Sequence, residues 1–205
     1  MSRFLGACAF AALVFVQTMA LARSVPPSEA VDAIWRIQSL PFEYSSSNVY
    51  YNCGSLRQKV RAILLAVGAH ESVVVQTNCQ DGPTNRISGR IALATPVPAT
   101  EDNLREATTF NTQDELVARL RSASLPTAND LVRFPAAWQT TSLSSIRDMT
   151  LTPADCELIK GITEQIFPRI TVRVIQSRKL MCGNYSSTFR PQMKFEALLP
   201  VTDQR

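Results

Sequence analysis

Glycine and histidine are both scarce in this chain of 205 residues, which has seven glycines and a single histidine, His70. No two glycines have the spacing of a Walker loop or of the GxGxxG and GxSxG motifs, which excludes the recognisable nucleotide-binding and hydrolase loops. One histidine cannot form a histidine-based metal cluster, and it leaves at most one imidazole for catalysis. His70 follows Gly68 and Ala69, and we interpret it as a solvent-facing turn residue.

Cysteines with the close spacing of a zinc knuckle or a redox motif are also missing. No C-x2-C pair occurs, so the sequence predicts neither a zinc site nor a thioredoxin-type centre, and no metal or cofactor is expected. The chain has no large excess of either charge, with 21 basic and 17 acidic residues, and 45% of its residues are hydrophobic. These values are typical of a folded globular protein and do not favour binding to nucleic acid.

The N-terminus has the pattern of an export signal. Arg3 precedes an apolar run over residues 4–16, and the small-residue site Ala20-Leu21-Ala22 follows. This predicts a signal peptide over residues 1–22, cleaved before Arg23, and a protein that is periplasmic or secreted. An uncleaved membrane anchor is the alternative. No membrane-spanning segment is expected in the mature chain.

Four cysteines remain in the mature chain, and their spacing repeats. Cys53 and Cys79 are 26 positions apart, as are Cys156 and Cys182. An even number of cysteines in an oxidising compartment predicts two disulfides. The equal spacing, and a strand running back antiparallel along each helix, favour Cys53–Cys79 and Cys156–Cys182.

The pattern around each pair also repeats. A stripe at helical spacing follows Cys53 and another follows Cys156, and each is followed by two apolar strands, over 72–77 and 86–95 and over 170–174 and 193–199. Strands over 40–45 and 138–144 precede the helices. We therefore predict an α+β fold with two similar disulfide-stapled α-β-β units, extended to β-α-β-β, with antiparallel strands. Equal spacing by chance, without duplication, stays an alternative.

The predicted units are separated by a linker of different composition. We expect residues 23–100 to hold an N-terminal helix and the first unit, 101–130 an acidic helical linker, and 131–205 the second unit, with both units in one compact domain. Ser28 would cap the N-terminal helix, which carries Val31, Ile34 and Trp35 on one face. In the linker, Thr112 and Glu115 predict a capping box for a helix through Ser122. Its apolar positions form one narrow face: Leu116, Val117 and Leu120.

The helix after Cys53 carries a candidate anion site. Basic side chains lie in its N-terminal half, where the helix dipole makes cations mildly unfavourable. They could hold an anion together with free backbone N–H groups, and the candidate residues are Ser55, Arg57, Lys59 and Arg61. A solvated polar face is the alternative.

Tyrosines and carboxylates are the other candidates. Tyr44, Tyr50 and Tyr51 flank a polar run and could stack on a sugar or peptide, unless they pack against the helix at Cys53. Four carboxylates lie in first helical turns, where they complement the helix dipole, so no catalytic residue is assigned. They are Asp114, Glu115, Asp155 and Glu157.

Two short stretches carry a resemblance to known sequences. Tyr50-Tyr51-Asn52-Cys53 and Phe134-Pro135-Ala136-Ala137-Trp138 resemble exported hypothetical proteins of proteobacteria, which have no assigned activity. The resemblance implies a bacterial periplasmic setting and transfers no site residues. From the export signal, the repeated cysteine spacing and the lack of a nucleophile–base or metal set, we expect a non-enzymatic binding or envelope-assembly module whose partner is an envelope protein or polymer. A hydrolase of envelope polymers and a small-anion binder at the Cys53 helix are the alternatives.

Overall fold

The computed structural model describes residues 29–79, 82–143, 151–177, 182 and 193–201. The predicted signal peptide, its cleavage site and Ser28 lie outside these residues. No helix among the described residues is long and apolar enough to cross a membrane.

Six antiparallel strands form one sheet, in the order β3-β5-β1-β6-β8-β7. Their bounds are β1 Val31–Ser45, β3 Val74–Thr77, β5 Arg86–Pro98, β6 Phe134–Ser142, β7 Val172–Ser177 and β8 Met193–Pro200. A second, two-stranded sheet pairs β2 (Tyr51–Asn52) with β4 (Pro83–Thr84). The helices are α1 Cys53–Ala66, α2 Glu101–Ala107, α3 Thr112–Leu120 and α4 Cys156–Gln165, with short 3-10 turns η2 (Pro153–Asp155) and η3 (Phe167–Arg169) around α4.

The two predicted units are present as β1-α1-β3-β5 and β6-α4-β7-β8, with β2 and β4 as additions to the first. In each unit the first strand pairs with the last, and the last pairs with the strand that follows the helix. The units meet where Val31 to Ala33 of β1 pair with Phe134 to Ala136 of β6. This confirms the predicted α+β class, while an origin by duplication stays a prediction.

Both predicted disulfides are confirmed. Cys53 is bonded to Cys79, with 6.0 Å between their Cα atoms, and Cys156 to Cys182, with 5.5 Å. The first cysteine of each pair begins its helix. In the first unit β3 runs back beside α1, which returns Cys79 to the start of that helix.

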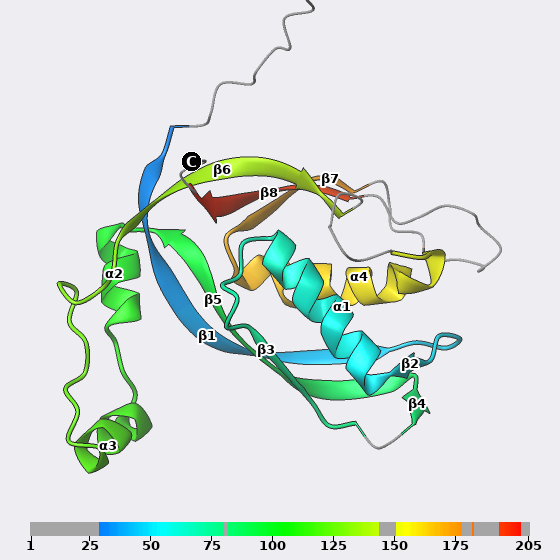
Figure 1. The fold of residues 1–205 in the computed structure, drawn as a ribbon, viewed down its shortest axis with the longest axis horizontal. Helices are drawn as coiled ribbons and strands as arrows, with labels where there is room; N and C mark the ends of the chain where they lie inside the picture. Colours follow the sequence, from blue (N-terminus) through cyan, green and yellow to red (C-terminus); the bar gives the residue numbers. More distant parts are fainter. Residues whose placement is uncertain (1–28, 80–81, 144–150, 178–181, 183–192, 202–205) are drawn as a thin grey trace, which may run out of the picture.

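The sheet curves around α1 and α4, which lie between its two halves (Figure 1). The side chain of Asn52 caps α1 by accepting the Gly54 N–H at 2.9 Å, and Gly68 ends the helical segment with a φ of 92°. The buried face of α1 and that of α4 join the inner faces of both half-sheets in one apolar core. Burial of that shared core holds the two units together.

Helix α4 covers an edge that β1 leaves unpaired. Beyond Ala33, β1 no longer pairs with β6. The Gln165 side chain accepts the Glu43 N–H at 2.9 Å and donates to the Glu43 carbonyl at 2.7 Å, while Gln38 donates to the Arg169 carbonyl at 3.2 Å. A side-chain amide thus satisfies backbone groups that a neighbouring strand would otherwise pair.

The predicted N-terminal helix is wrong. Residues Val31 to Trp35 belong to β1, where Ala33 pairs with Pro98 of β5 and with Phe134 of β6. Hydrogen bonding on both sides overrides the helical spacing of three apolar side chains, because β-branched and aromatic residues also suit a strand.

The linker differs from its prediction in two details. The capping box uses Asn111 and Asp114, one position before the predicted pair. Helix α2 was not predicted from the sequence.

Candidate functional site

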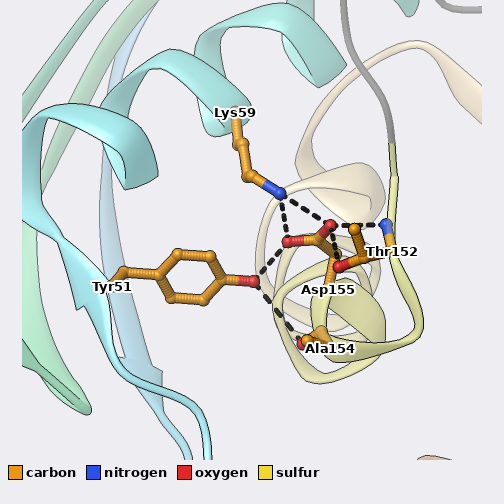
Figure 2. A network of polar contacts seen from close by, with 5 residues as sticks. All are labelled: Tyr51, Lys59, Thr152, Ala154 and Asp155. Atoms are coloured by element: carbon orange, nitrogen blue, oxygen red, sulfur yellow. Dashed lines mark hydrogen bonds and ion pairs between the residues drawn. The ribbon is translucent and has the colours of Figure 1, made fainter.

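A network of polar groups centres on Asp155, which is 0% exposed (Figure 2). The Lys59 ammonium lies 2.6 and 2.7 Å from the two carboxylate oxygens. The Tyr51 hydroxyl donates to one of these oxygens, and the Thr152 N–H and hydroxyl donate to the other at 2.7 and 2.9 Å. Every partner of this carboxylate is therefore a hydrogen-bond donor.

The network joins the two units. Lys59 lies in the second turn of α1, and Tyr51 lies on β2 immediately before that helix, so both come from the first unit. Asp155 lies in η2, at the start of α4 in the second unit, where Thr152 and Asp155 form a capping box. The Asp155 carboxylate of this capping box also bridges to α1 through Lys59.

The surroundings fix the protonation of this site. Burial raises the pKa of Asp155, but hydrogen bonds from Lys59, Tyr51 and Thr152 outweigh it and hold the pKa below its usual range. Burial and the hydrogen bond to Asp155 raise the pKa of Tyr51 well above its ordinary value. The phenol thus stays protonated and the carboxylate ionised. A carboxylate held by so many donors is a poor base, so this arrangement suits cohesion better than proton transfer.

The lowered pKa of Asp155 predicts a loss of stability in acid. Its folded-state pKa lies below the value of about 3.9 found in unfolded chains. The ionised group therefore stabilises the fold above that value, and the contribution is lost as pH falls through the folded-state pKa. Urea unfolding should show a constant difference between wild type and Asp155→Asn from about pH 5 to 8, and a shrinking difference below about pH 4. A difference that grows in acid would contradict this assignment.

The candidate anion residues do not converge on one point. The Lys59 ammonium is held by Asp155, whereas Arg61 donates to the Glu71 carbonyl at 2.8 Å, beyond the other end of α1. Ser55 and Arg57 are exposed in the first turns, and Arg57 Nε donates to the Cys53 carbonyl at 3.4 Å. Anion binding stays a prediction for Ser55 and Arg57, with the Lys59 charge already compensated.

The three candidate tyrosines have different surroundings. Tyr44 and Tyr51 are buried in the core, with their ring centroids 5.4 Å apart in an edge-to-face arrangement. Tyr50 is 61% exposed. Stacking on a ligand therefore stays a prediction for Tyr50, while the other two rings pack as the alternative interpretation expected.

His70 and Asp114, which were also singled out in the sequence, lie apart from this network. His70 Nδ1 is 2.8 Å from the Ser72 hydroxyl, and its ring packs edge-on against Trp35. Asp114 belongs to the capping box of α3. Among the described residues, no group of three or more histidine, cysteine or acidic side chains is placed to hold a metal ion.

The segment between β5 and β6, residues 99–133, lies at the surface, and we call it the arm. It carries α2 and α3, and α3 lies away from the sheet at its far end (Figure 1). No residue of the arm is buried. The apolar face predicted for its helix is present and open, with Leu116 53%, Val117 38% and Leu120 85% exposed.

Sequence reasoning identified the arm face but missed the buried ion pair. Each half of the pair carried a local signal: Lys59 is a cation in the N-terminal half of a helix, and Asp155 caps a helix. The two positions are 96 residues apart. Only the packing of one unit on the other brings them together.

Comparison with family models, with curated proteins and with solved structures finds no match for this chain. The candidate sites are therefore interpreted from their own geometry.

Proposed function

We propose that the protein is an exported, non-enzymatic binding or assembly module of the bacterial envelope, and that the arm is its contact surface. The observation that carries the proposal is the open face of α3, formed by Leu116, Val117 and Leu120. Clustered apolar side chains on a projecting helix are a recurrent mode of partner binding. The export pattern and the two disulfides fit a protein that works outside the cytoplasm.

The buried network supports the same proposal. Lys59, Tyr51 and Asp155 hold the two units together at the starts of α1 and α4, at the end of the molecule away from the arm (Figure 1). This arrangement supplies a scaffold from which the arm extends. Binding residues carried on a segment that projects from a firmly packed scaffold are common among interaction proteins.

Photo-crosslinking in the native host tests the proposal. Benzoylphenylalanine at position 120 should give a defined crosslinked adduct in intact cells, because Leu120 would lie in the contact. The same residue at position 37 is the matched control, since Ile37 is 83% exposed on β1 and Leu120 is 85% exposed on the arm. Equal adducts from both positions, or none from position 120, would contradict a contact surface on the arm.

A further inference from the structure

We infer that the arm binds a second copy of this chain, with the two α3 helices packed antiparallel through Leu116, Val117 and Leu120. The inference rests on the proposed function, because it names the partner of the same surface. Three observations support it. Helix α3 buries none of its residues within one molecule, its charges are ordered along the helix, and its apolar side chains can align with those of a second copy.

Helix α3 has little to stabilise it within one molecule. It has nine residues, and helices this short are marginal in water unless an apolar face packs against something. None of its residues is buried. Local support comes from the capping box of Asn111 and Asp114 and from an exposed ion pair between Arg119 and Glu115 at 4.0 Å. A partner on the apolar face would supply the missing burial.

The charges of α3 fit a second copy placed head to tail. The acids lie in its first turn, whereas Arg119 and Arg121 lie at its end. At about 3.6 residues per turn, Asp114 and Arg121 fall on the same flank of the apolar face, two turns apart. Antiparallel packing sets Asp114 of each copy opposite Arg121 of the other. A parallel arrangement would instead bring the acidic ends together.

The apolar side chains align in the same register. When Asp114 lies opposite Arg121 of the second copy, the twofold axis passes between positions 117 and 118. Leu116 then lies within about one residue of Leu120 of that copy, and the two Val117 side chains lie beside the axis. The interface is isologous, as in most symmetric dimers. A stripe of three side chains is smaller than the interfaces of tight complexes, so the dimer should be weak and depend on concentration.

Sedimentation of the oxidised mature chain tests self-association. From about 5 to 500 μM, a range suited to a small interface, the wild type should shift from monomer to dimer. Leu120→Glu should raise the dimer Kd at least about tenfold, because it places a charge in the apolar contact. Ile37→Glu is the matched control and should leave Kd unchanged. A wild type that stays monomeric, or an equal Kd for Leu120→Glu, overturns the inference.

A charge exchange tests the register. Asp114→Arg alone and Arg121→Asp alone each place like charges opposite one another, so each should weaken the dimer. An equimolar mixture should form a heterodimer, because both cross-pairs are then complementary. Both proteins keep the same individual folds in the mixture as alone, so fraying of α3 cannot account for the recovery. Failure of the mixture to associate above either variant overturns the antiparallel pairing.

The two levels of the proposal fail in different ways. A crosslink from position 120 to another protein, with a purified chain that stays monomeric, overturns the second copy and keeps the arm as the contact surface. A monomer that also gives no crosslink from position 120 overturns both. A crosslink between two copies, abolished by Leu120→Glu in the partner copy, supports both.

Discussion

Replacing Asp155 by alanine is expected to lower the free energy of unfolding by about 3–5 kcal/mol, the usual cost of breaking a buried ion pair from one side. The change leaves the Lys59 ammonium and the donors of Tyr51 and Thr152 without the acceptor that they share. The Lys59 side chain is only 21% exposed, so water replaces the lost contact incompletely. Equilibrium unfolding in urea, with the disulfides intact, measures the difference.

A double-mutant cycle separates the ion pair from its surroundings. Lys59→Met should also destabilise the protein, and the double variant should lose less stability than the sum of the single ones, with a coupling of about 1–3 kcal/mol. Lys160→Met is the control, because Lys160 pairs with Glu164 at 3.9 Å on the surface and both side chains are more than half exposed. That change should cost less than about 1 kcal/mol. Additive effects at positions 59 and 155 would contradict a direct bridge between the units.

The two units share little strand pairing. β1 and β6 share three paired residues on each strand, whereas β1 and β5 are paired along thirteen positions. The shared apolar core and the network at the starts of α1 and α4 therefore carry much of the contact between units. Core packing is non-directional, whereas the Asp155 contacts fix which groups must meet.

Local patterns predicted most of the fold. The cysteine spacing and the helical stripes after Cys53 and Cys156 depend on contacts within one unit, and both disulfides and both helices are where the sequence placed them. The error at Val31 to Trp35 arose because three apolar residues fit a helix or a strand equally well. The deciding factor was pairing with β5 and β6, whose residues are distant in sequence.

The site was predictable only where it is local. The exposed face of α3 follows from the spacing of three side chains within one helix. The ion pair of Lys59 does not follow from local spacing, because its counter-ion, Asp155, lies in the other unit. The same limit applies to Tyr44 and Tyr51, whose burial depends on how β1 and β2 lie against the core. Side chains grouped by sequence proximity near Cys53 therefore point in different directions in space.

Replacing Gly89 by alanine is expected to destabilise the protein by about 3 kcal/mol or more, the upper end of overpacking costs. Gly89 lies in β5 opposite Thr77 of β3, and a Cβ there would lie 2.0 Å from the Gln76 carbonyl oxygen. That contact is with backbone, so β3 must move away from β5. Movement of β3 would expose Val75 and disturb the strand that leads to Cys79.

Gly161→Ala is the matched control, because the same substitution in the interior of α4 should have the opposite sign. Its Cβ would meet the Gln165 amide nitrogen at 3.5 Å and the Glu43 carbonyl oxygen at 3.9 Å, which are ordinary contacts. Alanine in a helix interior is favoured over glycine by about 0.5–1 kcal/mol. Urea unfolding should therefore rank Gly161→Ala above the wild type and Gly89→Ala far below it. A Gly89→Ala protein as stable as the wild type would contradict the close approach of β3 to β5.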